Sequence, residues 1–287
     1  MQTNRRELLL KPTPLEKHDG IFVKREDLNE YGFPSGKLRG LIPYMKRLKA
    51  QGVKIVVNAG ATHSNSHSVV AFAADKVGLV CHTFVNSDRR PPACEFAKNI
   101  GATIHTTKPM HLSPLIAAAR EWTMTANLGR TANKPVATML PWGLTCSEIM
   151  REYAHAVAEL PRYNGETLHV VPMGAGGWVA GVFYGALQRS SHTVVAVPAM
   201  PTKNDENKLI DLLNLFDCPG KITELPASFW IVNHAPKTKE KPPFPCDPRY
   251  EYPAWEWAKW SSRKDEIAGT SPARHKRIIF WCIGSAV

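Results

Sequence analysis

Residues 53–85 read VKIVVNAGATHSNSHSVVAFAADKVGLVCHTFV, and this stretch decides the fold class. An apolar run at 53–60 passes through a polar turn into an amphipathic segment, and a second apolar run follows at 79–85. Buried strands that alternate with helical segments are typical of βαβ units on a parallel sheet. The alternation continues through 91–126, so the sequence predicts an α/β protein.

The pattern begins again in the C-terminal half of the chain. The run at 167–173, TLHVVPM, is predicted to be a strand, 174–190 a glycine-rich turn and helix, and 193–200 the next strand. Further strands are expected within 228–233 and 277–284. Two sheets are therefore predicted, one from the middle of the chain and one from the remainder, which the N-terminal segment joins. A cleft between two such sheets is the natural place for a ligand.

Composition narrows the class of protein. The 287 residues are 44% hydrophobic and 21% charged, close to the averages for globular proteins, which argues against disorder. The net charge of +11 comes from basic residues along the whole chain, which indicates a solvated basic surface and no nucleic-acid partner, and would attract anionic ligands. The six cysteines lack metal-ligand spacing, so no metal is expected. No run approaches a membrane span and no signal peptide is recognised, so a cytoplasmic location without membrane contact is expected.

The stretch MGAGGWVAG at 173–181 is the first of four that could carry chemistry. Glycines between a strand and a helix let backbone N–H groups converge on an anion, and the helix N-terminus adds partial positive charge. A dinucleotide site is the competing interpretation, but Val179 stands at the third glycine position and the next strand ends without an acidic residue. A tight turn without a ligand is the other alternative. The residues predicted to bind a phosphate group are Gly174, Ala175, Gly176 and Gly177.

The second stretch, GATHSNSHS at 60–68, again joins a predicted strand to a predicted helix. Ser64 and Asn65 are good N-cap residues, and capping alone could explain them. Capping does not explain the density of hydroxyl, amide and imidazole groups at the carboxyl end of a parallel strand. Open α/β sheets bind their ligands at that edge.

Two further stretches are weak when taken singly. In GFPSGKLRG at 32–40, Lys37 has the setting of an ordinary exposed lysine. In DPRYEYPAWEW at 247–257, Tyr250 and Glu251 begin an aromatic-rich helix whose tryptophans are expected to be packing residues. Neither stretch indicates a function without the others.

In this order, the four stretches resemble the fold type II pyridoxal-phosphate enzymes, the tryptophan synthase β-like superfamily. The likeness is strongest to the group containing 1-aminocyclopropane-1-carboxylate deaminase and D-cysteine desulfhydrase. It includes TPLEK, IFVKREDLN, SGKLRGL and LPWG, and extends over nearly the whole chain. The resemblance implies a large cofactor-binding domain of residues 1–44 plus 145–287 and a small substrate domain of residues 45–144. It further implies three-layer parallel-sheet domains, with the cofactor in the interdomain cleft, and a homodimer.

The resemblance also assigns roles to single residues. Lys37 would form the Schiff base with pyridoxal 5'-phosphate and carry the substrate proton. Asn65 would contact the 3′-oxygen of the cofactor, and Glu251 would contact its pyridine nitrogen. Ser64 and Tyr250 would contact the substrate or act as nucleophile, so the expected catalytic residues are Lys37, Ser64 and Tyr250.

The chemistry of such a site explains these residue types. An imine-forming lysine must spend time as a free amine, so burial or a cation such as Arg39 would lower its pKa. A carboxylate at the ring nitrogen keeps that nitrogen protonated, which makes Glu251 favour the deaminase side of the group. Several positions depart from the family pattern: Trp178 replaces a threonine, Gly36 an asparagine, Ser66 a glutamine and Cys282 a hydroxyl residue, and YEYPA at 250–254 lacks a lysine of the family.

The sequence therefore predicts a pyridoxal-phosphate-dependent deaminase or lyase that converts a small amino acid into ammonia and a 2-oxo acid. One alternative is a degenerate family member that binds the cofactor or a metabolite without turnover, motivated by Trp178, Cys282 and the short C-terminal half. A nicotinamide-dependent oxidoreductase on the same glycine turn and a nucleic-acid-binding protein are the remaining alternatives.

Overall fold

The computed structural model describes residues 11–89, 91–107, 111–130, 135–189, 191–216, 221–232, 241–267 and 277–284. The chain forms two compact units: the first runs up to Gly36 and resumes at Thr145, and the second is Lys37–Leu144. The sequence placed the first boundary at residue 44. The first compact unit of the structure ends at Gly36, eight residues before that boundary (44 − 36). Helix α1 (Leu38–Ala50) packs against helix α2 (Ser66–Val77) and therefore belongs to the second unit.

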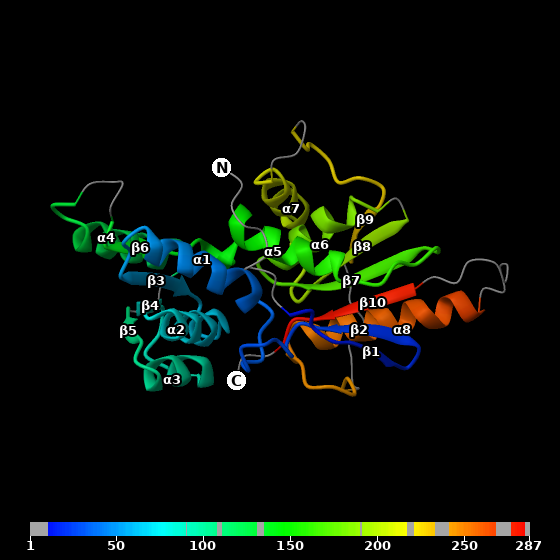
Figure 1. The fold of residues 1–287 in the computed structure, drawn as a ribbon, viewed down its shortest axis with the longest axis horizontal. Helices are drawn as coiled ribbons and strands as arrows, with labels where there is room; N and C mark the ends of the chain where they lie inside the picture. Colours follow the sequence, from blue (N-terminus) through cyan, green and yellow to red (C-terminus); the bar gives the residue numbers. More distant parts are fainter. Residues whose placement is uncertain are drawn as a thin grey trace. The chain divides into compact units, whose positions relative to one another are not determined.

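The first unit contains a six-stranded sheet (Figure 1). Its strands, in order across the sheet, are β1 (Leu15–His18), β2 (Ile21–Arg25), β10 (Arg277–Cys282), β7 (Thr167–Met173), β8 (His192–Pro198) and β9 (Phe229–Ile231). The β1–β2 pair is antiparallel, and every other neighbouring pair is parallel. The prediction that the N-terminal segment joins this sheet is confirmed, since β2 pairs with β10.

Helices cover both faces of this sheet. The helices of the unit are α5 (Ser147–Ala158), α6 (Gly177–Ala186), α7 (Asp205–Leu213) and α8 (Glu251–Ile267). Helix α8 covers one face, where alternate strand residues form an apolar core with Ala254 and Trp255. Helix α6 packs on β7 and β8 at the other face, with α5 and α7 against it. That face is less apolar, because it includes the buried side chains of His169 and Trp281.

The second unit contains a four-stranded, wholly parallel sheet. Its strands, in order, are β5 (Thr103–Thr106), β4 (Val80–Val85), β3 (Ile55–Gly60) and β6 (Ala137–Met139). Helix α4 (Leu112–Ala126) packs on one face, where Leu115 and Ala119 meet Val57 and Phe84. Helix α2 packs on β3 and β4, beside α1 and α3 (Pro92–Asn99), and a short turn of 3₁₀-helix, Trp142–Leu144, ends the unit.

These observations confirm the α/β class and the two parallel arrangements that the sequence predicted. Cys81 and Cys282 are buried free thiols, as expected, whereas Cys218 lies outside the described residues. None of the helices in the described part of the chain combines the length and the hydropathy that a membrane crossing requires.

Candidate active site

The turn between β7 and α6 has glycine at two positions where a larger residue would not fit. Gly176 has a φ of +94°, in the left-handed region that favours glycine, and a Cβ there would lie 2.9 Å from Leu212 Cδ1. A Cβ on Gly174 would lie 2.9 Å from the ring of Tyr250. The turn therefore keeps its shape and its close approach to Tyr250 only while both residues are glycine.

This turn presents backbone donors and one cation at the carboxyl end of β7. The first N–H groups of a helix have no acceptor within the helix, so those at the start of α6 can point to an anion. Lys208 of α7 donates a hydrogen bond from Nζ to the carbonyl oxygen of Gly174 at 2.7 Å. Burial lowers the pKa of Lys208, and the carboxylate of Asp205 opposes this shift. Backbone donors beside an ammonium group are a suitable environment for a phosphate.

The side chain of Trp178 lies in the interior of the first unit, although its backbone belongs to the first turn of α6. Its indole stacks on the ring of Tyr153, with ring centroids 4.2 Å apart, and it is 5% exposed. The indole Nε1 is buried, and no described residue forms a hydrogen bond with it. Because the indole is buried against α5, the bulk of Trp178 does not conflict with an anion bound by backbone N–H groups of the turn.

Trp178 and Gly36 are complementary in size. A Cβ on Gly36 would lie 3.0 Å from Cζ2 of the indole and 2.7 Å from Cβ of Glu26. The N–H of Gly36 donates to the carbonyl oxygen of Ile283 at 2.7 Å, which fixes the backbone directly before Lys37 to the end of β10. The unusual tryptophan and the unusual glycine are therefore one structural feature, since the indole borders the space that a side chain at position 36 would need.

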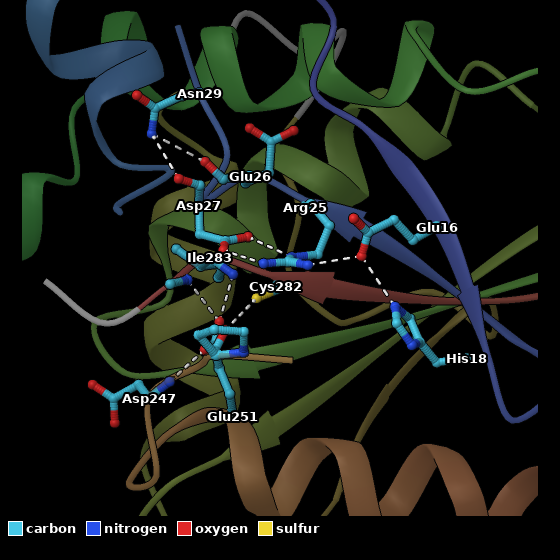
Figure 2. A network of polar contacts seen from close by, with 12 residues as sticks. Glu16, His18, Arg25, Glu26, Asp27, Asn29, Asp247, Glu251, Cys282 and Ile283 are labelled. Atoms are coloured by element: carbon cyan, nitrogen blue, oxygen red, sulfur yellow. Dashed lines mark hydrogen bonds and ion pairs between the residues drawn. The ribbon is translucent and has the colours of Figure 1, made fainter. Parts of the chain in front are cut away.

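Side-chain hydrogen bonds hold the segment that follows β2 (Figure 2). Arg25 grips Asp27 at two points, from Nε to Oδ1 at 2.9 Å and from Nη2 to Oδ2 at 2.7 Å, and donates from Nη1 to Glu16 at 2.7 Å. The Asn29 amide donates to backbone carbonyl oxygens of its own loop. Charge-assisted and backbone-directed bonds of this kind fix a loop conformation. The sequence after β2 is thereby held in place up to Gly36.

Glu251, the first residue of α8, binds backbone groups at the end of β10 (Figure 2). Its Oε1 accepts hydrogen bonds from the N–H groups of Ile283 and Gly284, and its Oε2 accepts one from Asp247 at 2.6 Å. Burial raises the pKa of Glu251 to about 8, and these three backbone donors oppose the rise. Because the two oxygens of a carboxylate accept about four hydrogen bonds, one acceptor position remains on Oε2.

Tyr250 lies beside the glycine turn. Oδ1 of Asp247 accepts hydrogen bonds from the N–H groups of Arg249 and Tyr250, which forms the turn that begins α8. The ring of Tyr250 faces Gly174, while Glu251 binds the end of β10. Strands β7 and β10 are parallel neighbours, so these residues share the carboxyl edge of the sheet. Ligands of open parallel sheets bind at this edge.

In the second unit, Lys37 stands at the N-cap position of α1 and is half-buried. Its carbonyl oxygen accepts a hydrogen bond from the N–H of Leu41 at 3.1 Å. Burial lowers the pKa of His67 to about 4, and the charge of Lys37 adds to this lowering. The charge of Lys37 therefore acts on the first turn of α2, where His67 lies.

The turn between β3 and α2 is built from polar side chains. Ser64 and Ser66 share a hydrogen bond between their hydroxyl groups at 2.8 Å, and Ser64 Oγ accepts another from the N–H of Ser66. Asn65 occupies the N-cap position, but its side chain makes no capping hydrogen bond. Capping, the simpler interpretation of the sequence, therefore does not account for Asn65.

His67 supports this turn from inside the unit. Its ring Nε2 lies 2.9 Å from the carbonyl oxygen of Ala61 and therefore carries the proton, while Nδ1 accepts a hydrogen bond from the Asn58 amide at 3.0 Å. The imidazole is fully buried and neutral. It fixes the backbone that carries Ser64 and Asn65.

The structure brings the predicted site residues together in two groups, one in each unit. In the first unit, Gly174–Gly177, Tyr250 and Glu251 share one sheet edge. In the second unit, the charge of Lys37 acts on His67, whose ring is hydrogen-bonded to the backbone of the turn that carries Ser64 and Asn65. Sequence reasoning missed Lys208, because a lysine on an amphipathic helix has no local mark that distinguishes it from a solvated one.

Comparisons with known proteins place the chain among cofactor-dependent enzymes. The sequence profile of the family described as "Pyridoxal-phosphate dependent enzyme" matches residues 6–210. This segment contains Lys37, the Ser64–Asn65 turn and the glycine turn, but not Tyr250 or Glu251.

Curated relatives match the chain over different lengths. Nocardicin C-9' epimerase of Nocardia uniformis subsp. tsuyamanensis is 29% identical over 61% of the chain, and the match spans 46% of that protein. A putative 1-aminocyclopropane-1-carboxylate deaminase of Pyrococcus horikoshii is 36% identical over 21% of the chain and 18% of its own length. The glycyl-dTMP PLP-dependent decarboxylase of Pseudomonas phage M6 is 21% identical over 96% of the chain and its entire length. The chain thus spans less than half of the first two relatives.

Solved structures share the fold. The chain resembles an ACC deaminase homologue with a TM-score of 0.73 at 19% identity, over 92% of this chain and 84% of that one. It resembles an L-serine ammonia-lyase of Rhizomucor miehei with a TM-score of 0.66 at 16% identity, over 97% and 95% of the two chains. At these identities the likeness establishes the fold.

Proposed function

The chain belongs to the pyridoxal-phosphate-dependent enzymes, and from this premise we propose that it deaminates or cleaves a small amino acid, releasing ammonia and a 2-oxo acid. The observation that carries the proposal is the glycine turn at the carboxyl end of β7, with the Lys208 ammonium against it. The family match supports it, since the matched segment contains Lys37, the Ser64–Asn65 turn and this turn in the expected order.

The residues of the glycine turn fit the phosphate of the cofactor. The backbone approaches Tyr250 so closely at Gly174 that a Cβ would collide, and Gly176 adopts a conformation that other residues avoid. A turn of this shape exposes backbone N–H groups at the start of α6, and Lys208 adds a positive charge. We therefore assign Gly174, Ala175, Gly176 and Gly177 to the phosphate group.

Other residues would hold the rest of the cofactor and the substrate. When bound, pyridoxal phosphate draws electrons away from the substrate Cα, which allows a bond at that carbon to break. Lys37 would hold the cofactor covalently and, as a free amine, move the proton on Cα. Asn65 would orient the ring through its amide, while Ser64 and Tyr250 would bind the substrate. Tyr250 lies beside the glycine turn, which suits a residue that contacts substrate near the phosphate.

Glu251 is proposed as the partner of the ring nitrogen. Burial raises its pKa to about 8, and one acceptor position of Oε2 is left by its backbone donors. A positively charged ring N–H would be a stronger donor than water in that position, and its charge would favour the ionised carboxylate. The deaminase side of the proposal is supported by this carboxylate and by the putative 1-aminocyclopropane-1-carboxylate deaminase among the relatives.

An absorption spectrum of the purified protein tests the cofactor assignment. A band near about 410–430 nm that borohydride removes, and that Lys37→Ala lacks, is expected for a covalent lysine–cofactor bond. Lys46→Ala is the matched control, since Lys46 is an exposed lysine of the same helix α1. Retention of the band in Lys37→Ala, or its absence after addition of pyridoxal phosphate, would contradict the assignment.

A panel of small amino acids then tests the reaction. Ammonia and a 2-oxo acid are expected from at least one of them, including 1-aminocyclopropane-1-carboxylate and both isomers of cysteine and serine. Cofactor binding without turnover on any member would favour a family member that binds without catalysis, the alternative that Trp178 and Cys282 raised at the sequence level. Release of the opposite stereoisomer would instead indicate a racemase.

A second candidate function is the decarboxylation of a glycine-bearing nucleotide. It is favoured by the phage glycyl-dTMP decarboxylase, the relative that this chain matches over nearly all of its length, and by the net charge of +11. A positive field attracts an anionic nucleotide more strongly than a neutral amino acid. Release of CO₂ from glycyl-dTMP, without reaction of free glycine, would select this function. No CO₂ at saturating glycyl-dTMP would exclude it.

A further inference from the structure

Arg277, the first residue of β10, is a buried arginine that pairs with no carboxylate among the described residues. It is 7% exposed, and its guanidinium donates a hydrogen bond from Nη1 to the carbonyl oxygen of Pro161 at 3.0 Å. Within the described part of the chain, its buried Nε and Nη2 have no acceptor and it makes no ion pair. In Arg25, the guanidinium edge formed by Nε and Nη2 donates two hydrogen bonds to the carboxylate of Asp27. In Arg277 this edge is unused.

Thr167 adds a third unused group. Arg277 and Thr167 are register partners on parallel neighbouring strands, and Thr167 pairs in turn with His192. Residues in register project to the same face of a sheet, so these three side chains are side by side. The Thr167 hydroxyl is buried and has no hydrogen-bond partner among the residues that the structure describes. Each residue is the first of its strand, so the cluster lies at the amino ends of β7, β8 and β10.

A chain of hydrogen bonds determines the proton positions on His192. The indole N–H of Trp281 can only donate, and it donates to Nδ1 of His169 at 3.1 Å. The proton of neutral His169 therefore sits on Nε2, which lies 2.7 Å from Nδ1 of His192. His192 must accept there, so its own proton is on Nε2. His192 consequently offers an N–H to its surroundings, as Arg277 does.

The surroundings of this cluster are positively charged. Burial lowers the pKa of Arg277, and the nearby charge of Arg189 adds to the lowering. Burial also lowers the pKa of His192 to about 4, and Arg189 and Arg277 both contribute. A buried charge without a counter-ion is costly, and protein interiors normally pair it. Lys24 and Arg25 follow that rule here, since both have carboxylate partners.

We propose that Arg277, Thr167 and His192 form a binding site for an oxyanion, such as a phosphate or carboxylate group of a small molecule. The three residues offer four donors to such a group: Nε–H and Nη2–H of Arg277, the Thr167 hydroxyl and the Nε2–H of His192. Planar two-point recognition by a guanidinium edge, completed by a hydroxyl and an N–H, matches the oxygens of such a group.

This site is separate from the glycine turn. It lies at the amino end of β7, whereas the glycine turn follows the carboxyl end of that seven-residue strand, about 20 Å away. The ring of Tyr163 lies 4.8 Å from the Arg277 guanidinium and is 36% exposed, so it packs against that charge at the surface of the unit.

Thermal unfolding of the protein with its cofactor bound tests the proposal. Inorganic phosphate, sulfate and acetate are each compared with sodium chloride at equal ionic strength. The proteins compared are the unaltered protein, Arg277→Gln and Thr167→Val, with Arg120→Gln as the control, because Arg120 is an exposed arginine of the second unit. Saturating anion is expected to raise Tm by about 3–6 °C in the unaltered protein and in Arg120→Gln, and by much less in the other two.

The order of stabilities gives a sharper expectation. Without an oxyanion, Arg277→Gln removes a buried unpaired charge and should have a Tm equal to or above that of the unaltered protein; with phosphate the order should reverse. A preference for phosphate and sulfate would indicate a tetrahedral ligand, and a preference for acetate a carboxylate. An equal anion effect in Arg277→Gln, or no effect beyond that of chloride, would overturn the proposal. Cofactor absorbance in the same samples reports any competition at the glycine turn.

Discussion

The turns that follow β3 and β7 both end a buried parallel strand and begin a helix, yet they present different atoms. The β3–α2 turn exposes the side chains of Ser64 and Asn65 and is supported by the buried His67. The β7–α6 turn has glycine where side chains would stand and presents backbone N–H groups, with Lys208 beside them. The binding groups of the β3–α2 turn are side chains, whereas the β7–α6 turn can present its backbone only because its glycines have no side chains.

This difference follows from the proposed ligands. A phosphate has oxygens in all directions, so several backbone donors at a helix N-terminus suit it. A ring and a small substrate need a few directed side-chain groups. Removal of a side chain should therefore damage the β3–α2 turn, and addition of a side chain should damage the β7–α6 turn.

The largest effect is expected for Gly176→Ala. The new Cβ would lie 2.9 Å from Leu212 at a φ of +94°, and strain of about 3 kcal/mol would weaken cofactor binding about 100-fold. Titration of the apoprotein with pyridoxal phosphate measures this loss. Gly52→Ala is the control, since Gly52 has a φ of +93° with nothing within 4 Å of its Cβ position. Unchanged cofactor affinity in Gly176→Ala would refute a backbone-built phosphate site.

The next effect concerns the other turn. Asn65→Ala removes an amide that does not cap α2. The loss of its proposed hydrogen bond to the cofactor ring should weaken cofactor binding about 10-fold and shift the absorption maximum of the cofactor. His63→Ala, an exposed residue of the same turn, should leave both unchanged. If both variants behave like the unaltered protein, the β3–α2 turn has no direct contact with the cofactor.

Both turns could be located from the sequence, because their signals are local. An apolar strand followed by glycines, or by a cluster of small polar residues, indicates a ligand-binding turn at a parallel sheet edge. The role of Glu251 could be proposed only through the resemblance, and the sequence did not indicate its three backbone donors. These donors come from residues 247, 283 and 284, and the contacts to the last two span more than thirty positions.

The contact between Gly36 and Trp178 was also beyond the sequence. Each residue was identified as a departure from the family pattern, but their complementarity depends on a contact between segments more than a hundred residues apart. The unpaired charge of Arg277 is similar, since it depends on strand register and on the absence of a carboxylate nearby among the described residues. Local patterns predict elements, whereas such contacts arise only from how the elements pack.

The two turns should also differ in how pH affects them, because the β3–α2 turn is supported by a histidine that must stay neutral. Burial lowers the pKa of His67 to about 4 in the folded state, against about 6.5 for an unperturbed histidine. Below about pH 6.5, His67 binds a proton in the unfolded chain but stays neutral in the folded chain. The free energy of unfolding therefore decreases as the pH falls toward 4. This residue alone should cost about 1.4 kcal/mol at pH 5.5 relative to pH 7.5.

His67→Gln cannot titrate and should lose less stability over that interval, by about the same 1.4 kcal/mol. The exposed His63→Gln should keep the slope of the unaltered protein. Urea unfolding at the two pH values measures both differences. An identical slope in His67→Gln would mean that His67 is not held neutral, and that its bond to Ala61 does not require the proton position assigned here.

The smallest effect links the β7–α6 turn to the residue before Lys37. If Trp178 excludes a side chain at position 36, then Gly36→Ala should destabilise the protein less when Trp178 is replaced by leucine. A Cβ at position 36 meets the indole at 3.0 Å but also meets Glu26 at 2.7 Å, so only part of the cost is relieved. A coupling of about 1 kcal/mol between Gly36→Ala and Trp178→Leu is therefore expected.

Urea unfolding of the two single variants and the double variant measures this coupling. Gly129→Ala paired with Trp178→Leu is the control, because a Cβ on Gly129 meets nothing within 4 Å. The absorption band of the cofactor adds a second readout, since Gly36 directly precedes Lys37 and a displaced backbone would move the lysine. Strict additivity with an unchanged band would show that the tryptophan and the glycine are independent. A measured coupling would mean that Trp178, the second residue of α6, limits the size of the side chain at position 36, directly before Lys37.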